Sequence, residues 1–288
     1  MGQLPDAPRR PRPHDEAMTT SSEASESFQI PLEAAEFYES AFVPAFFAQW
    51  APILCDAAGV APGQRVLDIG CGTGIVARTA ADLVAPDGTI VGVDLNEAML
   101  TVARRVVRPD IEFRQGNADA LPLPDQSFDT VLCQMSLMFF PDRPQALLEM
   151  ARVVTPGGRV AVAVPGALDA QPAFAPFVDM AARHAGPEAM SLLSTYFVCG
   201  NLEELTGLVE SAGLQVTTAR THSGTYRAPS VDAFVTTEVE STPLLELISD
   251  DVYRRIRADA HDVLAPFTTP DGSIAAPFEC NIVTARRP

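Results

Sequence analysis

The feature that most constrains the fold is a regular alternation of apolar runs and helical periodicity between residues 64 and 165. Strands that are apolar along their whole length and alternate with helices are typical of a parallel sheet covered on both faces. Right-handed crossovers then make the predicted fold a doubly wound α/β sheet. The runs rich in Val, Ile and Leu lie at 65–69, 89–94, 128–134 and 159–164, and a further strand is expected at 111–115. Helical segments lie at 75–84, from Asn96, and at 142–154.

The flanking segments depart from this pattern and set the expected domain organisation. Residues 1–27 are rich in Pro, then in Ser, Thr, Glu and Ala, which predicts a disordered tail. Residues 28–288 are expected to form a single domain, with aromatic residues at near-helical spacing predicting N-terminal helices over 28–63. Segments 166–200 and 222–276 lack the alternation and are expected to be insertions that cap the substrate site. Between and after them the sequence predicts a helix that begins at Asn201, a strand at 214–221 and a last strand at 278–285.

The charge balance excludes several classes of function. The chain carries 37 acidic and 20 basic residues, a net charge of −17, which argues against nucleic acid and anionic membranes as partners. Every basic residue is arginine, so chemistry that needs a lysine amine is excluded. No run reaches the roughly 18 apolar residues of a membrane helix. We therefore expect a cytoplasmic protein without membrane insertion, and the sequence leaves open whether it forms a homo-oligomer.

A glycine-rich turn follows the first predicted strand, in the sequence Val66-Leu67-Asp68-Ile69-Gly70-Cys71-Gly72-Thr73-Gly74. Such a turn lets the backbone approach a ligand closely and aim its amides at it. Taken alone, it also fits a dinucleotide-binding fold. However, the dinucleotide fingerprint requires glycine at the position of Ile75. The Asp68 carboxylate would also repel a pyrophosphate, whereas it can hold an ammonium group.

Two later segments extend the predicted site. Asp94 ends the second strand, where a carboxylate can accept hydrogen bonds from both ribose hydroxyls of an adenosine. The loop Gly116-Asn117-Ala118-Asp119 follows the third strand, where it can reach the edge of the base. Asp119 is expected to be an exposed acid.

Together these segments resemble the class I S-adenosylmethionine-dependent methyltransferases. The most similar branch contains the ubiquinone/menaquinone C-methyltransferases (methyltransferase type 11) and many small-molecule methyltransferases of secondary metabolism. The resemblance covers residues 36–286 and is specific over 64–165. It implies S-adenosyl-L-methionine as the cofactor. It also implies a Rossmann-like, seven-stranded doubly wound sheet with an antiparallel last strand, N-terminal helices and a helical lid.

The resemblance also assigns contacts to the cofactor. It gives Asp68, Gly70, Cys71, Gly72 and Gly74 to the methionine portion, Asp94 to the ribose, Leu95 and Met99 to the faces of the adenine, Asn117 and Ala118 to its edge, and Gln134 to the amino-acid end. Many relatives carry Asp where Asn117 stands, and an amide oxygen can still accept a hydrogen bond from the adenine amine.

Methyl transfer from a sulfonium is an in-line displacement, so the protein mainly aligns the acceptor and excludes water. A base is needed only where the acceptor must lose a proton, as would a phenol with a pKa of about 10. The candidates for a catalytic group are His222 and Tyr38. His184 and His261 also lie in the cap segments, where packing or surface roles are the ordinary explanation. His14 lies in the predicted tail.

An apolar acceptor pocket is expected around the aromatic N-terminal helices and the segment after the fourth strand. Such a pocket suits a hydrophobic or aromatic small molecule. Met138 and Phe139 can equally pack against the helix that follows. The pocket residues that we expect are Tyr38, Phe42, Met135, Met138, Phe139 and Phe197.

Metal-dependent transfer is not expected, because Asp129 and Asp142 near the fourth strand have structural explanations, in a strand and at a helix start. The first alternative function is a protein that binds S-adenosylmethionine but catalyses a rearrangement or cyclisation. The second is a nicotinamide-dependent oxidoreductase, against which Ile75, Asp68 and the loop at 116–119 argue.

Overall fold

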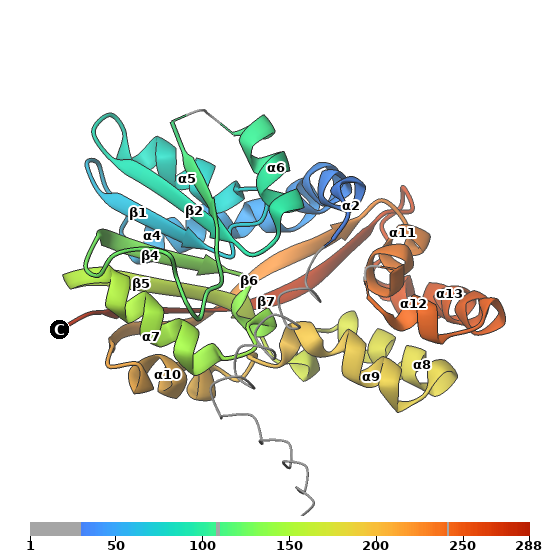
Figure 1. Cartoon of the computed structure of the whole chain (residues 1–288). Helices are drawn as coiled ribbons and strands as arrows, with labels where there is room; N and C mark the ends of the chain where they lie inside the picture. Colours follow the sequence, from blue (N-terminus) through green and yellow to red (C-terminus); the bar gives the residue numbers. More distant parts are fainter. Residues whose placement is uncertain (1–29, 108–109, 241) are drawn as a thin grey trace, which may run out of the picture.

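The computed structural model describes residues 30–107, 110–240 and 242–288, so the predicted tail and His14 lie outside the described part. A seven-stranded sheet in the order β3-β2-β1-β4-β5-β7-β6 forms its centre (Figure 1). Strands β1 to β5 run parallel, and β7 is antiparallel to both β5 and β6, which confirms the predicted fold. The strands are β1 Arg65–Ile69, β2 Thr89–Asp94, β3 Glu112–Gln115, β4 Phe128–Gln134, β5 Val154–Pro165, β6 Gln215–Ala228 and β7 Ile274–Arg286.

Helices cover both faces of this sheet. On one face, α4 (Trp50–Ala58) and α5 (Ile75–Val84) pack on one set of strand side chains. On the other face, α7 (Arg143–Val153) and α10 (Leu202–Ser211) pack on the alternate set. Both faces of β1, β2, β4 and β5 are therefore largely buried, which explains their apolar sequences, whereas the edge strand β3 is polar and partly exposed. Helix α6 (Glu97–Val106) lies against β2 and β3 at the edge of the sheet.

Polar side chains start three of these helices, as the sequence predicts. Asn96 accepts hydrogen bonds from the backbone N–H groups of Ala98 and Met99 at the start of α6. Asp142 accepts one from Gln145 at the start of α7. Asn201 caps α10 through its first backbone amides. These caps satisfy amides that have no partner within the helix, and thereby fix where each helix begins.

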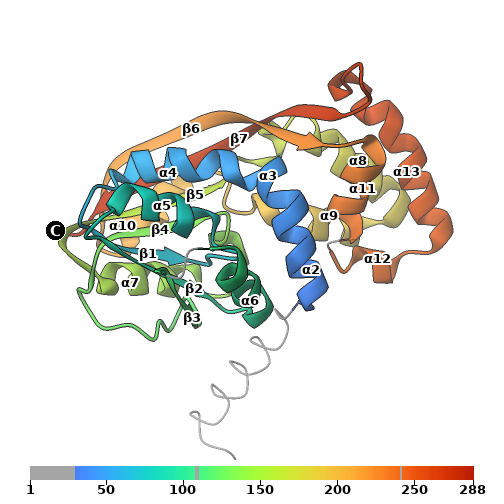
Figure 2. The ribbon, with the colours of Figure 1, turned by 90° about the horizontal axis from the view of Figure 1, so that it is seen from above.

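The N-terminal helices cross one end of the sheet and are held there by ion pairs (Figure 2). Glu36 pairs with Arg105 of α6 and Glu39 pairs with Arg78 of α5, each at 2.8 Å. No single helix in the described ranges is long and apolar enough to cross a membrane, and one bent pair, 32–45 with 47–58, meets the test of length and composition. Before α4, the elements are α2 Leu32–Phe37, η1 Tyr38–Phe42, α3 Val43–Ala45 and η2 Phe47–Gln49.

The cap lies at the far end of the long ribbon that β6 and β7 form (Figure 2). The strand predicted at 214–221 continues to Ala228, and the last strand begins at Ile274 instead of 278. The sequence does not predict residues 222–228 as part of β6, because this edge strand carries polar Thr, Arg and His side chains in place of an apolar run. The cap elements are η4 Leu168–Ala170, α8 Phe174–Ala185, α9 Pro187–Leu193, η5 Thr195–Phe197, α11 Val231–Val235, η6 Thr236–Glu240, α12 Leu244–Leu247, α13 Asp250–Leu264 and η7 Ala265–Phe267.

Candidate functional site

The glycine turn and the end of β2 are joined by direct hydrogen bonds. The backbone N–H of Gly72 donates to Asp94 Oδ2 at 2.8 Å, and that of Asn96 donates to Oδ1 at 2.8 Å. Cys71 N–H donates to the carbonyl of Val93 at 3.1 Å. The backbone N–H of Leu95 is also hydrogen-bonded to this carboxylate. Since a carboxylate offers about four acceptor positions, Asp94 can still accept a hydrogen bond from a ligand. The carboxyl ends of β1 and β2 are thus held together at the edge where doubly wound sheets bind ligands.

The three glycines of the turn have different surroundings. A Cβ on Gly70 would lie 2.5 Å from Ser136 Oγ, and one on Gly74 would lie 3.0 Å from the Phe113 ring. A Cβ on Gly72 would meet only the ring of Tyr38, at 3.8 Å, although the φ of +54° strains other residues there. Packing therefore explains Gly70 and Gly74, whereas the Cβ position of Gly72 is the least crowded of the three and is in contact with Tyr38.

Asp68 is a buried carboxyl group beneath the turn. It is 1% exposed and accepts a 3.0 Å hydrogen bond from the backbone N–H of Ala77 in α5. Burial, with a smaller contribution from the charge of Asp94, raises its pKa to about 8. A cationic ligand would restore the ionised form, because an opposite charge nearby favours it. The position thus suits the ammonium group for which Asp68 is predicted.

Two polar side-chain atoms near the turn are buried without a hydrogen-bond partner. They are Thr73 Oγ1 and Gln134 Oε1. The amide of Gln134 donates to the carbonyl of Phe47 at 3.1 Å, which fixes its orientation. Buried polar atoms are ordinarily paired, so such an orphaned acceptor at the end of β4 indicates a place for a ligand donor. Gln134 and Asp68 together fit the amino-acid end of S-adenosylmethionine.

The residues predicted around the adenine lie along the ends of β2 and β3. Leu95 and Met99 are half-buried, and so is Asn117, whose Oδ1 accepts from the backbone N–H of Asp119 at 3.4 Å. Ala118 is buried in the core beneath the loop. Asp119, expected to be exposed, is half-buried, and burial raises its pKa. The loop folds back on itself, which the sequence reasoning did not foresee.

Tyr38 lies over Gly72 and connects the turn to the N-terminal helices. Its ring centroid is 5.9 Å from that of Phe42 and 5.0 Å from that of Phe47. Burial, and then the charges of Asp94 and other nearby acids, raise the pKa of Tyr38 far above its usual value. Its hydroxyl therefore stays protonated near neutral pH, where it can donate a hydrogen bond.

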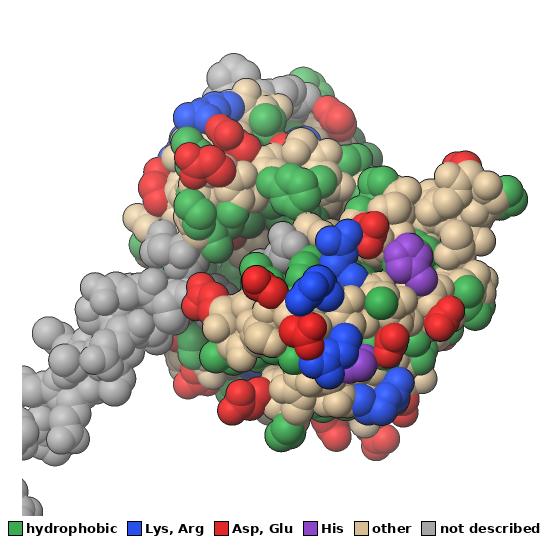
Figure 3. Space-filling view, turned by 90° about the vertical axis from the view of Figure 1, so that its right-hand side faces the viewer, with side chains coloured by type: hydrophobic (Ala, Val, Ile, Leu, Met, Phe, Trp, Pro, Cys, Tyr) green, Lys and Arg blue, Asp and Glu red, His purple; other side chains and the backbone are tan. Residues whose placement is uncertain are grey.

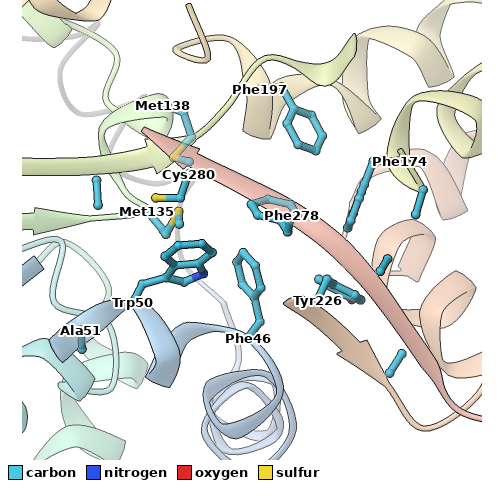
Figure 4. Close-up of a cluster of buried hydrophobic side chains, with 14 of the residues drawn as sticks. Phe46, Trp50, Ala51, Met135, Met138, Phe174, Phe197, Tyr226, Phe278 and Cys280 are labelled. Carbon is cyan, nitrogen blue, oxygen red and sulfur yellow. The ribbon is translucent and has the colours of Figure 1, made fainter. Parts of the chain in front are cut away.

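The other predicted pocket residues meet in a large buried cluster. Met135, which directly follows β4, has a φ of +52°, a strained conformation of the kind that gathers at functional sites. Phe139 packs against the cluster, and Phe42 reaches it through Tyr38 and Phe47. Figure 4 shows side chains from the N-terminal helices, the segment after β4, the cap and the β6–β7 ribbon converging here. We call this the aromatic cluster: Phe46, Trp50, Met135, Met138, Phe174, Phe197, Tyr226 and Phe278.

The described histidines lie in the cap helices and in β6. His184 contacts Asp259 at 2.7 Å and His261 lies 3.7 Å from Asp232, on the face of the cap where Figure 3 shows arginine, histidine and acidic side chains intermingled. His222 lies in β6, which is separated from β4 by β7 and β5. At about 4.8 Å per strand this is roughly 14 Å. The structure therefore does not bring His222 to the other predicted residues.

The acids weighed as metal ligands have structural partners. Asp129 forms a 2.7 Å ion pair with Arg65, and Asp142 caps α7. Over 30–107, 110–240 and 242–288, no group of three or more His, Cys, Asp or Glu residues is arranged to hold a metal ion.

Comparison with known proteins identifies the part of the chain that carries this site. Residues 67–162 match the family described as Methyltransferase domain. This segment is similar in sequence to methyltransferase domains. It contains the turn, Asp94, the loop at 116–119 and Gln134, so the predicted resemblance is confirmed over the residues on which it rested.

Two relatives share this domain. The chain is 44% identical over 118 residues to the ubiquinone/menaquinone biosynthesis C-methyltransferase UbiE of Hahella chejuensis, covering 39% of the chain and 47% of that protein. It is 41% identical over 129 residues to the demethylmenaquinone methyltransferase of Renibacterium salmoninarum, covering 45% and 51%. The chain therefore spans about half the length of the curated relatives it matches.

Solved structures extend the likeness of the fold beyond the methyltransferase domain. The YcgJ protein of Bacillus subtilis matches with a TM-score of 0.56 and 22% identity, over 83% of this chain and 98% of that one. The cyclase SpnF matches with a TM-score of 0.52 and 20% identity, over 84% and 80%. Identities this low establish the fold alone. Since one neighbour is a cyclase, the reaction must be argued from the site.

Several features of the site are not visible in the sequence. The Glu39–Arg78 ion pair joins residues 39 positions apart, and Ser136 contacts Gly70 from the segment after β4. The buried contact between Tyr226 and Glu238 also has no motif. The sequence around it, Thr236-Thr237-Glu238-Val239-Glu240, gives no signal that distinguishes Glu238 from its neighbours.

Proposed function

We propose that this protein transfers a methyl group from S-adenosylmethionine to a small aromatic acceptor. The observation that carries the proposal is the Gly72–Asp94 hydrogen bond at a glycine whose Cβ position meets the Tyr38 side chain, with the buried Asp68 beneath the turn. The Asp94 carboxylate would accept a hydrogen bond from a ribose hydroxyl, and the Asp68 carboxylate would accept one from an ammonium group. A pyrophosphate would meet two acids, which disfavours the dinucleotide alternative.

The acceptor is proposed to be a hydroxylated aromatic ring, of the class of reduced quinones. The aromatic cluster supplies an apolar wall for such a ring, and the names of both relatives refer to quinone methylation. The name of the Hahella relative also specifies carbon as the atom methylated. By this likeness, the methyl group is proposed to go to a ring carbon. We further propose that no metal takes part, because the nearby acids already have structural partners.

The residues of this chain would bind and orient the reactants. Asp68 and Gln134 would hold the ammonium group, Asp94 the ribose, and Asn117 with Ala118 the adenine edge. When bound, S-adenosylmethionine supplies an activated methyl group, so alignment and exclusion of water are the main tasks of the protein. Tyr38 and the ion pairs of the N-terminal helices would close the site over the turn.

Calorimetric titration with S-adenosylmethionine, S-adenosylhomocysteine and NADPH tests the cofactor. We expect binding of the first two and none of the third, and binding of NADPH alone would refute the proposal. Incubation with S-adenosylmethionine and 1,4-dihydroxynaphthalene, followed by mass spectrometry, tests the reaction. A product that has gained one methyl group on carbon supports the assignment. Cofactor binding with a rearranged but unmethylated product would indicate a cyclase-type reaction.

A further inference from the structure

A carboxyl group is buried in the cap beside the aromatic cluster. Glu238 in η6 is 8% exposed and accepts a 3.1 Å hydrogen bond from the hydroxyl of Tyr226 in β6. The hydroxyl of Thr237 is hydrogen-bonded to the same Tyr226 oxygen. Tyr226 is thereby held by both of its neighbours, and the carboxyl group of Glu238 has a fixed position.

No cation neutralises this carboxyl group among the described residues that act on it. Tyr226 is the one ionisable group with an influence on the pKa of Glu238, and burial raises that pKa to about 7. The helices packed against η6 carry Asp232, which pairs with Arg257, and Glu246, which is exposed. Burying an acid without a cation is costly, so its retention calls for a function.

The pair adjoins the aromatic cluster, against which the acceptor is proposed to bind. The ring centroid of Tyr226 is 5.5 Å from that of Phe46, which is 5.0 Å from Phe47, which in turn is 5.0 Å from Tyr38 over Gly72. Tyr196 acts electrostatically on both Tyr38 and Tyr226. A continuous aromatic wall therefore runs from the glycine turn to the buried acid.

The backbone supplies an independent observation. Tyr38 begins the π-helix η1, and Glu238 lies inside the π-helix η6. π-helical turns are rare and occur frequently at functional sites, because they cost stability and reposition side chains. Here two of them present polar groups at opposite ends of the same aromatic wall.

We propose that Glu238, held by Tyr226, binds a hydroxyl group of the aromatic acceptor and takes its proton. The inference rests on the proposed function and names a residue that completes it. An acid in this setting can be an effective base near neutral pH, because general bases work best when their pKa lies near the working pH. No histidine is then required.

The step balances as follows. The hydroxyl proton passes to the Glu238 carboxylate, and the electron pair left on oxygen enriches the ring. A ring carbon then bonds to the sulfonium methyl group while the S–C bond breaks and its electron pair stays on sulfur. The proton on that ring carbon leaves to water, and Glu238 returns its own proton to the oxygen. One methyl group is gained and one proton is released.

The first test measures binding to the full chain saturated with S-adenosylhomocysteine. The probes are 2-naphthol and 2-methylnaphthalene, which differ in the hydroxyl group. Wild-type protein is expected to prefer 2-naphthol by about 10-fold or more, as a hydrogen bond to a charged group provides. Glu238→Gln and Tyr226→Phe should each reduce that preference, whereas Glu246→Gln on the cap surface should keep it. Equal binding of the two probes, no binding of either, or an unchanged preference in Glu238→Gln would overturn the proposal.

The second test separates this inference from the proposed function. Failure of the wild-type protein to bind S-adenosylhomocysteine would refute the proposed function. The two probes could then be compared in the absence of S-adenosylhomocysteine, and this comparison would still decide whether Glu238 binds a hydroxyl group. If 1,4-dihydroxynaphthalene is methylated, Glu238→Gln should lower kcat by about 100-fold and remove its rise with pH through about 7. A wild-type kcat and pH profile in that variant would overturn the role of Glu238 alone.

Discussion

The backbone N–H of Gly72 donates to the carboxylate of Asp94 across 2.8 Å, which joins the first strand's turn to the end of the second strand. The acid thus has a structural role before any ligand arrives, since it fixes the glycine that faces Tyr38. Asn96 binds the other oxygen of the same carboxylate. The turn and the acid therefore form one preorganised unit.

Replacing Asp94 with Ala should weaken binding of S-adenosylmethionine by about 100-fold or more. Two charge-assisted hydrogen bonds to the ribose would be lost, each of about 1.5–3 kcal/mol, as well as the support of the turn. Calorimetry measures the affinity, and Asp87→Ala in an exposed turn serves as the control. An affinity within about twofold of wild type would contradict the assignment of the ribose site.

Replacing Gly72 with Val should abolish cofactor binding while the protein remains folded. The new side chain would occupy the space between the turn and Tyr38. Gly63→Val is the matched control, because Gly63 also has a positive φ, of +81°, with no atom near its Cβ position. Both variants should lose a similar stability, about 1–2 kcal/mol from backbone strain. Retained binding in Gly72→Val would show that the ligand lies elsewhere.

Replacing Glu39 with Gln should loosen the N-terminal helices without unfolding the protein. The ion pair with Arg78 is partly exposed, so its contribution to stability is expected to be about 1 kcal/mol or less. Amide hydrogen exchange over residues 32–42 should accelerate, and Glu33→Gln on the exposed face of α2 provides the comparison. Equal exchange in the two variants would show that this ion pair does not hold the helices.

Replacing Glu238 with Gln should change how stability depends on pH. Burial raises the pKa of Glu238 from about 4.5 to about 7 in the folded protein, so the folded state binds its proton more tightly than the unfolded state. The resulting stabilisation is complete below pH 4.5 and is lost as pH rises through about 7, a change of about 3 kcal/mol. Urea unfolding should therefore show the variant gaining stability relative to wild type between about pH 5 and pH 8. If the free energies of unfolding of the variant and of wild type differed by the same amount at every pH, the burial of this carboxyl group would be contradicted.

Replacing Gly224 with Ala should destabilise the junction between the N-terminal helices and the β6–β7 ribbon. A Cβ there would lie 2.6 Å from the ring of Trp50, which is fully buried. Such overpacking costs about 1–3 kcal/mol. Gly207→Ala in α10, with no atom near its Cβ position, should instead gain about 0.5–1 kcal/mol. Urea unfolding of both variants measures the change in the free energy of unfolding relative to wild type.

Sequence reasoning was most successful where one physical rule determines the local structure. The bounds of β1, α5, β2 and β4 agree with the predicted ranges because apolar runs, caps and the glycine turn all favour the same structure. Helices α8 and α9 were missed because the segment has little periodic contrast between apolar and polar residues.

The parts of the site that depend on distant residues could not be predicted. The space at Gly72 depends on Tyr38, and the packing at Gly70 depends on Ser136. The burial of Glu238 follows from where the cap folds over β6. Each of these is a tertiary contact between segments whose separation along the chain carries no recognisable spacing.

The N-terminal helices carry Tyr38 and Phe42. The same helices are attached to α6 and α5 by the ion pairs of Glu36 and Glu39. One segment therefore contacts both the glycine turn and the aromatic cluster. Under the proposed function, the cofactor and the acceptor would both bind against this segment, and a displacement of it would alter both sites at once.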